Sequence, residues 1–266
     1  MKTKTTDLMK PGSGETLVFD RTPCLMDKAT HYCPGCHHGI AHRLVAEVID
    51  ELGLREKTIL AASVGCSAFI YDYMDVDCIE APHGRASAVA CGVKRARPDR
   101  VVFAYQGDGD LAAIGTNEAL HAANRGEGIT IIFINNTVYG MTGGQMAPTT
   151  LLGQKTTTTP HGRSFNNEGG PLHMAELMGL LDGVSFSARC ALNTVKNVMA
   201  AKKALRAAFE IQVGQNGYGF VELLSGCPTN WHMDALAANE HIGKAMIPVF
   251  PLGTFKDART ARKSAA

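Results

Sequence analysis

Short, nearly continuous hydrophobic runs recur along the chain and alternate with stretches of helical periodicity. Four of the runs have the length and composition of strands that are buried on both faces: residues 57–63, 101–105, 129–135 and 220–224. Five other stretches place hydrophobic residues at helical spacing: residues 38–52, 85–97, 111–125, 171–181 and 194–210. Because the two patterns alternate, the sequence predicts an α/β fold with a doubly wound, mainly parallel sheet and helices on both faces.

Residues 137–170 interrupt this alternation, because Gly, Thr, Pro and Asn dominate there. A loop of that length inside a compact domain is usually functional. The predicted organisation is an N-terminal extension (1–30), one main domain (31–250) and a C-terminal tail (251–266). The last part, 256–266, is basic and rich in small residues, so we expect a solvated end.

Composition narrows the class of protein. The chain has 266 residues, of which 45% are hydrophobic and 19% are charged, so it can bury a sizeable core. Its 26 Lys and Arg residues nearly balance 25 Asp and Glu residues, which argues against a nucleic-acid-binding face. A polar N-terminus and the lack of an apolar run near ~20 residues predict no membrane span and a cytoplasmic location. There the eight cysteines would stay reduced and free for metals or chemistry.

A Gly-Asp-Gly-Asp segment, Gly107 to Asp110, directly follows one predicted strand. The next strand ends at Asn135-Asn136, so one crossover brings Asp108 and Asn136 to the same edge of the sheet. A carboxylate, an amide oxygen and a backbone carbonyl suit a Mg²⁺ ion that also bridges two phosphates, and glycines let a phosphate approach the backbone. Gly-Asp-Gly alone is also common in turns, but its place between strand and helix favours the phosphate site.

These segments, together with the stretch from Val138 to Gln145, resemble the diphosphate-binding motif of thiamine-diphosphate enzymes. More narrowly, the chain from about Tyr32 to Trp231 is similar to the β subunit of the 2-oxoacid:ferredoxin oxidoreductases. The resemblance implies a thiamine-diphosphate-binding fold for residues 31–250, with thiamine diphosphate and Mg²⁺ as cofactors.

The resemblance also assigns residues to these cofactors. It implies that Asp108, Asn136 and the backbone carbonyl of Val138 bind Mg²⁺. It places His83, in the segment His83-Gly84-Arg85, beside thiamine diphosphate, although a polar residue there also fits a helix cap. The complete set implied around thiamine diphosphate is Val64, Gly65, Cys66, Ser67, His83, Gly107, Gly109, Asp110, Gly140, Met141 and Thr142.

Four cysteines form a second candidate site. Cys33 and Cys36 form a CxxC pair, whereas Cys66 and Cys227 each follow a predicted strand. Such a set can hold a [4Fe–4S] cluster or a structural zinc ion. A zinc ribbon would show two CxxC pairs, and a thioredoxin-like dithiol would follow a strand. With His37 the pair also matches a c-type haem attachment motif, which needs export, and any single cysteine can be a plain buried residue.

The resemblance favours the cluster, because the family's β subunit binds one [4Fe–4S] cluster through cysteines at matching places. It implies Cys33, Cys36, Cys66 and Cys227 as the ligands. The remaining cysteines match nothing in the family and are expected to be core or surface thiols: Cys24, Cys78, Cys91 and Cys190.

The implied reaction is the oxidative decarboxylation of a 2-oxo acid with coenzyme A, and ferredoxin takes the electrons. The implied substrate is 2-oxoisovalerate or 2-oxoglutarate. The glutamate that activates thiamine diphosphate is not found here, so an α subunit is expected to supply it, with γ and ferredoxin-like δ subunits as further partners. Two alternatives remain: a non-redox thiamine-diphosphate decarboxylase or synthase subunit with a structural four-cysteine site, and a zinc-stabilised binding module.

Overall fold

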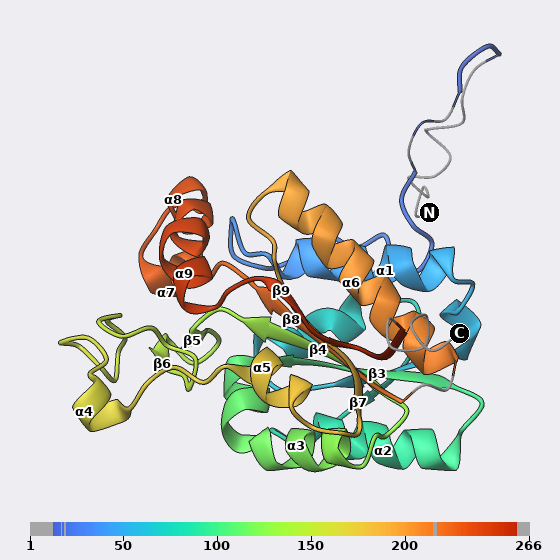
Figure 1. Ribbon diagram of the computed structural model, residues 1–266. Coiled ribbons are helices and arrows are strands. Elements are labelled where there is room, and N and C mark those ends of the chain that lie inside the picture. Colours follow the sequence, from blue (N-terminus) through green and yellow to red (C-terminus); the bar gives the residue numbers. More distant parts are fainter. Residues whose placement is uncertain (1–12, 17, 19, 215–216, 260–266) are drawn as a thin grey trace.

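A seven-stranded sheet runs through the centre of the molecule, for which a computed structural model describes residues 13–16, 18, 20–214 and 217–259 (Figure 1). The strand order is β2-β1-β3-β4-β8-β7-β9, and every pairing is parallel except the last, between β7 and β9. The bounds are β1 Thr58–Ala62, β2 Asp77–Glu80, β3 Val101–Gly107, β4 Thr130–Asn135, β7 Val184–Ala191, β8 Tyr218–Leu224 and β9 Gly253–Asp257.

Helices cover both faces of this sheet, which confirms the predicted doubly wound α/β fold (Figure 1). One face carries α1 (His38–Glu51) and α6 (Val195–Val213). The other carries α2 (Ala86–Ala96), α3 (Thr116–Asn124) and α5 (Met174–Gly179). Successive residues of a central strand therefore enter different cores, and this explains why the hydrophobic runs are continuous rather than alternating.

A smaller third core lies beyond the sheet edge. It packs α7 (Pro228–Trp231), α8 (Ala235–His241) and α9 (Ile247–Val249) against the start of the predicted functional loop. That loop carries the hairpin of β5 (Val138–Tyr139) and β6 (Gln145–Met146), and then α4 (Phe165–Glu168). In Figure 1 this segment extends to the left of the sheet, away from α2 and α6.

The hydrophobic pattern of the sequence does not predict three strands of the main sheet: β2, β7 and β9. β2 is an edge strand whose four residues are all exposed, and β7 contains a buried Arg189. β9 lies within the expected tail, so the prediction of a solvated end is wrong for residues 256 and 257, which belong to this strand; residues 260–266 lie outside the described residues. The helix predicted over 111–125 is two elements, a π-helical turn at Gly109–Ile114 followed by α3.

Short helices complete the described part of the chain. They are the 3₁₀ helices Arg55–Lys57 and Cys66–Asp72 and the π-helical turn Ile242–Met246. Over the described residues, no helix combines the length and the apolar character that crossing a membrane requires.

Candidate functional site

A cavity opens at the carboxyl ends of β1, β3 and β4, where an open parallel sheet usually binds its ligands. Every residue that the sequence assigns to thiamine diphosphate or Mg²⁺ lines it. Two further residues, His38 and Tyr139, line it without having been assigned. The lining is His38, Val64, Gly65, Cys66, Ser67, His83, Gly107, Asp108, Gly109, Asp110, Asn136, Val138, Tyr139, Gly140, Met141 and Thr142.

The Asp108 carboxyl group is buried at the floor of this cavity. Its Oδ2 accepts hydrogen bonds from the backbone amides of Thr137 (2.7 Å) and Asn136 (3.1 Å) and from the Thr149 hydroxyl (2.8 Å). Burial nevertheless raises the pKa of Asp108 to about 7, because the charged form loses its hydration. All three of these bonds end on the same oxygen, Oδ2.

Asp110 has a different role from its neighbour, because its carboxylate holds other parts of the cavity wall. Oδ1 accepts from the backbone amides of Gly84 (2.8 Å) and Val64 (3.3 Å) and pairs with His83 Nδ1 at 2.7 Å. Oδ2 accepts from the side chain of Gln106. Asp110 thus orients His83 and leaves the other ring nitrogen, Nε2, to meet a ligand.

Two glycines that line the cavity, Gly109 and Gly140, pack closely against other parts of the protein. A Cβ on Gly109 would lie 2.7 Å from the ring of Tyr139, so the close packing of that ring alone requires glycine here. At Gly140 a Cβ would lie 3.5 Å from Cys66 Sγ and 3.6 Å from Cys227 Sγ. One wall of the cavity is therefore shared with two of the candidate cluster ligands.

The four candidate cysteines lie near one another, and two of them, Cys66 and Cys227, lie at this shared wall. The pKa of the Cys36 thiol is raised to about 12, first by burial and further by the neighbouring Cys227, Cys66 and Cys33. Burial also raises the pKa of Cys66, to about 11, and that of Cys227. Thiolates are disfavoured in such a site unless a metal stabilises them, and a bound metal deprotonates its thiols.

A tight turn brings the CxxC pair next to residues near the C-terminal end of the sequence. Gly35 has a φ of 78°, and a Cβ there would lie 2.6 Å from the Cβ of Ala235. The backbone amide of Gly226 donates to Nδ1 of the buried His37 at 3.1 Å. Sequence spacing cannot show this contact, which joins residues 189 positions apart.

Within the described ranges, no group of three or more His, Cys, Asp or Glu residues converges closely enough to hold a single metal ion. The candidate Mg²⁺ ligands would not form such a group, since only one of them is a carboxylate; the other two are a side-chain amide and a backbone carbonyl. In a four-iron cluster each thiolate binds a different iron, so the sulfurs stand further apart than around one ion.

Trp231 makes a hydrogen bond to the backbone of Asn136, one of the candidate Mg²⁺ ligands. Its indole Nε1 donates to the backbone carbonyl of Asn136 at 3.1 Å, and its ring is buried in the third core. The amide of Asn230, one residue earlier, donates to the carbonyl of Gly140 (2.8 Å) and to Cys227 Sγ (3.2 Å). The segment after Cys227 therefore contacts both candidate sites.

Buried aromatic and histidine rings pack behind the cavity. His38 Nδ1 shares a 2.7 Å hydrogen bond with the Tyr105 hydroxyl, and the ring of Tyr32 stacks on His38. The pKa of His38 is lowered to about 3, mainly by burial. Burial also lowers the pKa of His42, whose two ring nitrogens have no hydrogen-bond partner in the part of the chain that the structure describes. Both rings are therefore neutral in the folded protein at physiological pH.

These histidines predict a loss of stability in mild acid. Below about pH 6.5 the unfolded chain takes up protons on His42 that the folded chain does not bind, so the free energy of unfolding falls as pH falls. At pH 5 the expected loss is about 2 kcal/mol for each such histidine. His42→Leu should therefore reduce by that amount the stability lost between pH 7 and pH 5 in urea unfolding. The matched control, His121→Leu on the exposed face of α3, should not; an unchanged loss in His42→Leu would contradict this assignment.

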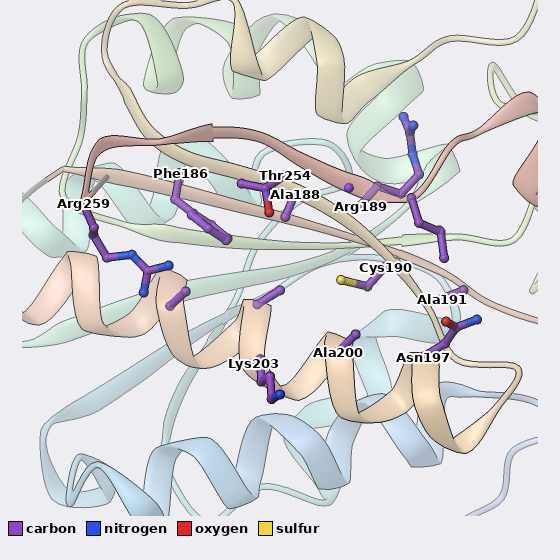
Figure 2. Close-up of a pocket in the computed structure, with 14 residues that line it drawn as sticks. Phe186, Ala188, Arg189, Cys190, Ala191, Asn197, Ala200, Lys203, Thr254 and Arg259 are labelled. Atoms are coloured by element: carbon purple, nitrogen blue, oxygen red, sulfur yellow. The ribbon is translucent and has the colours of Figure 1, made fainter. Parts of the chain in front are cut away.

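A second hollow, of about 410 Å³, lies between α6 and the strands β7 and β9 (Figure 2). Its lining includes Cys190, Lys203, Thr254 and Arg259, and it shares no residue with the cavity above the sheet edge. The Arg259 guanidinium lies over the ring of Phe186 and pairs with acidic side chains of the same region. None of the predicted site residues reaches this hollow.

Comparison with known proteins gives several consistent matches. Residues 63–223 match the family described as thiamine pyrophosphate enzyme, C-terminal TPP binding domain. The chain is 50% identical over 240 residues to ketoisovalerate oxidoreductase subunit VorA of Methanothermobacter thermautotrophicus, a match that covers 90% of this chain and 50% of VorA. It is 38% identical over 206 residues to 2-oxoglutarate synthase subunit KorB of Methanocaldococcus jannaschii, covering 76% of this chain and 72% of KorB.

A solved structure is also similar: the 2-oxoglutarate:ferredoxin oxidoreductase from Magnetococcus marinus, determined with 2-oxoglutarate, coenzyme A and succinyl-CoA bound. The TM-score is 0.72 at 25% sequence identity, and the match covers 92% of this chain and 87% of that chain. The chain spans about half the length of the VorA relatives. The family that the motifs resemble is thus confirmed: this chain belongs to the thiamine pyrophosphate enzymes and, within them, to the subunits of the 2-oxoacid:ferredoxin oxidoreductases.

Proposed function

We propose that this chain is the subunit of a 2-oxoacid:ferredoxin oxidoreductase that binds thiamine diphosphate, Mg²⁺ and one [4Fe–4S] cluster. The complete enzyme would convert a 2-oxo acid and coenzyme A to an acyl-CoA and CO₂ and pass two electrons to ferredoxin. The observation that carries this proposal is the shared wall at Gly140, which lines the cavity of Asp108 and lies beside the sulfurs of Cys66 and Cys227, 3.5 and 3.6 Å from the position that a Cβ there would take. The proposed diphosphate site and the proposed cluster site are therefore next to each other.

The residues present fit a magnesium diphosphate group. Asp108 is buried and held by three hydrogen-bond donors, and its pKa is raised because burial removes water from the ionised form. A bound cation would stabilise that ionised form. Asp108, Asn136 and the Val138 carbonyl would hold Mg²⁺, a hard cation that takes oxygen ligands and is commonly shared with phosphate oxygens.

The four cysteines fit a cluster for a similar reason. Their sulfurs come from three separate segments of the chain, and the pKa values of Cys36, Cys66 and Cys227 are raised mainly by burial. Iron would stabilise the thiolates, and Asn230, which donates to Cys227, would stabilise charge on that sulfur.

Bound thiamine diphosphate supplies the electron sink that lets a 2-oxo acid lose CO₂. The chain's own residues would bind it and orient it. His83, held by Asp110, would present Nε2 to the cofactor, while Gly107 and Gly109 would form the backbone beside the diphosphate. Cys66 lines the same cavity and would fix the cluster close to the cofactor, which shortens the path for electron transfer.

A partner subunit is part of the proposal. No glutamate is among the described residues that line this cavity, so the group that activates the cofactor would come from an α subunit. The names of the relatives as subunits support a multi-subunit enzyme. We propose γ and ferredoxin-like δ subunits as further partners and ferredoxin as the acceptor, with the cytoplasm as the location.

The proposed substrate is 2-oxoisovalerate or a similar branched-chain 2-oxo acid. The support is the 50% identity with the ketoisovalerate enzyme subunit, against 38% with a 2-oxoglutarate synthase subunit. The complex that co-purifies with this chain should reduce methyl viologen only when coenzyme A is present, with a higher kcat/KM for 2-oxoisovalerate than for 2-oxoglutarate. A preference for 2-oxoglutarate would overturn the substrate; no coenzyme A-dependent turnover with either would overturn the activity.

A further inference from the structure

Thr137 has an unusual backbone conformation at the centre of the proposed magnesium site. It lies between Asn136 and Val138, is fully buried, and has a φ of 64°. A β-branched residue rarely adopts this left-handed conformation, because its side chain crowds the backbone. Such a conformation persists only where the surroundings hold it in place.

One loop donates two of the hydrogen bonds that hold it. Gln154 Nε2 donates to Thr137 Oγ1 at 2.9 Å, and the hydroxyl of Thr150 donates to the Thr137 carbonyl. The hydroxyl of Thr149, from the same loop, donates to Oδ2 of Asp108 at 2.8 Å. The Thr137 amide then donates to that same oxygen. The loop thus contacts both a proposed ligand and the residue between the other two.

The loop itself is closed by a buried arginine. The Arg163 guanidinium donates to the backbone carbonyls of Pro148 (2.9 Å) and Thr150 (2.6 Å), and also to those of Gly169 (2.8 Å) and Gly170 (2.7 Å). Within the described residues, no carboxylate forms an ion pair with it. The guanidinium of Arg163 therefore orders the backbone of the segment that carries Thr149 and Thr150.

We propose that residues 147–163, here called the buttress loop, position the magnesium and diphosphate site. Thr149 and Gln154 are positioning residues: neither lines the cavity, and each acts through Asp108 or Thr137. Arg163 fixes the loop. This inference rests on the proposed binding of Mg²⁺ and thiamine diphosphate, and it assigns a role to the Gly, Thr and Asn-rich segment that goes beyond contact with the cofactor.

The test is metal affinity at saturating thiamine diphosphate, with Mn²⁺ as an EPR-visible substitute for Mg²⁺. The protein is the full chain with its co-purifying subunits. Both Thr149→Val and Gln154→Met nearly keep the side-chain volume. Thr149→Val removes the donor to Asp108, and Gln154→Met removes the donor to Thr137 together with the acceptor of the Leu151 amide. Each should weaken Mn²⁺ binding by roughly tenfold, which is typical when a residue that orients a ligand is lost. Thr149→Ser keeps the hydroxyl and should restore wild-type affinity.

Thr157→Val is the matched control, since it makes the same change at an exposed position of the same loop. It should bind Mn²⁺ like the wild type. Hydrogen exchange gives a second readout: in the metal-free protein, the amides of Asn136 and Thr137 should exchange faster in Thr149→Val than in the control. A wild type that binds no Mn²⁺ with thiamine diphosphate would refute the proposed function. A wild type that binds it, with Thr149→Val and Gln154→Met unchanged, would refute the buttress loop alone.

Discussion

Asp108→Asn should abolish the retention of thiamine diphosphate and Mg²⁺ while leaving the iron content unchanged. The amide can still accept hydrogen bonds from Thr149 and Thr137, so the fold of the loop should survive, but the charge that a cation needs is gone. Because Asp108 would bind the ion directly, its loss should exceed the effect of an orienting residue and weaken metal binding by roughly 100-fold or more.

The measurement is thiamine and magnesium content after gel filtration, together with turnover. Asp108→Ala should show the same loss, although it also leaves the donors of Thr149 and Thr137 unpaired in a buried site. Asp99→Ala, at an exposed carboxylate paired with Arg97, is the control and should keep both cofactors. Full cofactor occupancy in Asp108→Asn would show that the metal assignment is wrong.

Cys227→Ser should remove most of the cluster iron while leaving thiamine diphosphate binding largely intact. A serine hydroxyl is a poor replacement for a thiolate, because clusters are held by sulfur ligands. Loss of the cluster should stop electron transfer to an external acceptor. The readouts are iron and acid-labile sulfide per chain and the absorbance of the cluster.

Cys78→Ser provides the control for that substitution. Cys78 lies on the exposed edge strand β2, away from the CxxC turn, so iron should be unchanged in this variant. If Cys227→Ser keeps the iron content of the wild type, Cys227 does not belong to the ligand set.

The central strands and the cavity could be predicted from the sequence because local pattern and topology agree there. A strand covered on both faces needs hydrophobic residues at every position, as β3 and β4 have. Because β3 and β4 are parallel, the motif that follows β3 and the asparagines at the end of β4, Asn135 and Asn136, lie at the same edge of the sheet. The residues around Asp108 followed from that edge and from the resemblance.

Strand β7 could not be predicted in the same way, because its hydrophobic pattern is broken by a charge. Arg189 lies fully buried in the strand, where Glu222 of β8 meets its Nε at 3.0 Å and Glu176 of α5 binds its terminal nitrogens. Burial of an arginine is tolerated only with such partners, and they are 33 and 13 residues away. The hydrophobic periodicity of the sequence does not reveal these two partners.

The supports of the site escaped prediction for a related reason. Thr149 is 41 residues from Asp108, and a threonine in a polar loop has no distinctive spacing. The close contact of Gly35 with Ala235 likewise depends on the folded chain. The length and composition of 137–170 predict a functional loop, but not which of its side chains would act.

The most direct test of the account is an EPR spectrum of the anaerobically purified, dithionite-reduced chain with its proposed α subunit alone. We expect the signal of one reduced [4Fe–4S] centre per chain, accompanied by stoichiometric thiamine diphosphate. An EPR-silent protein that contains zinc in place of iron would contradict the redox function and reduce the four cysteines to a structural site.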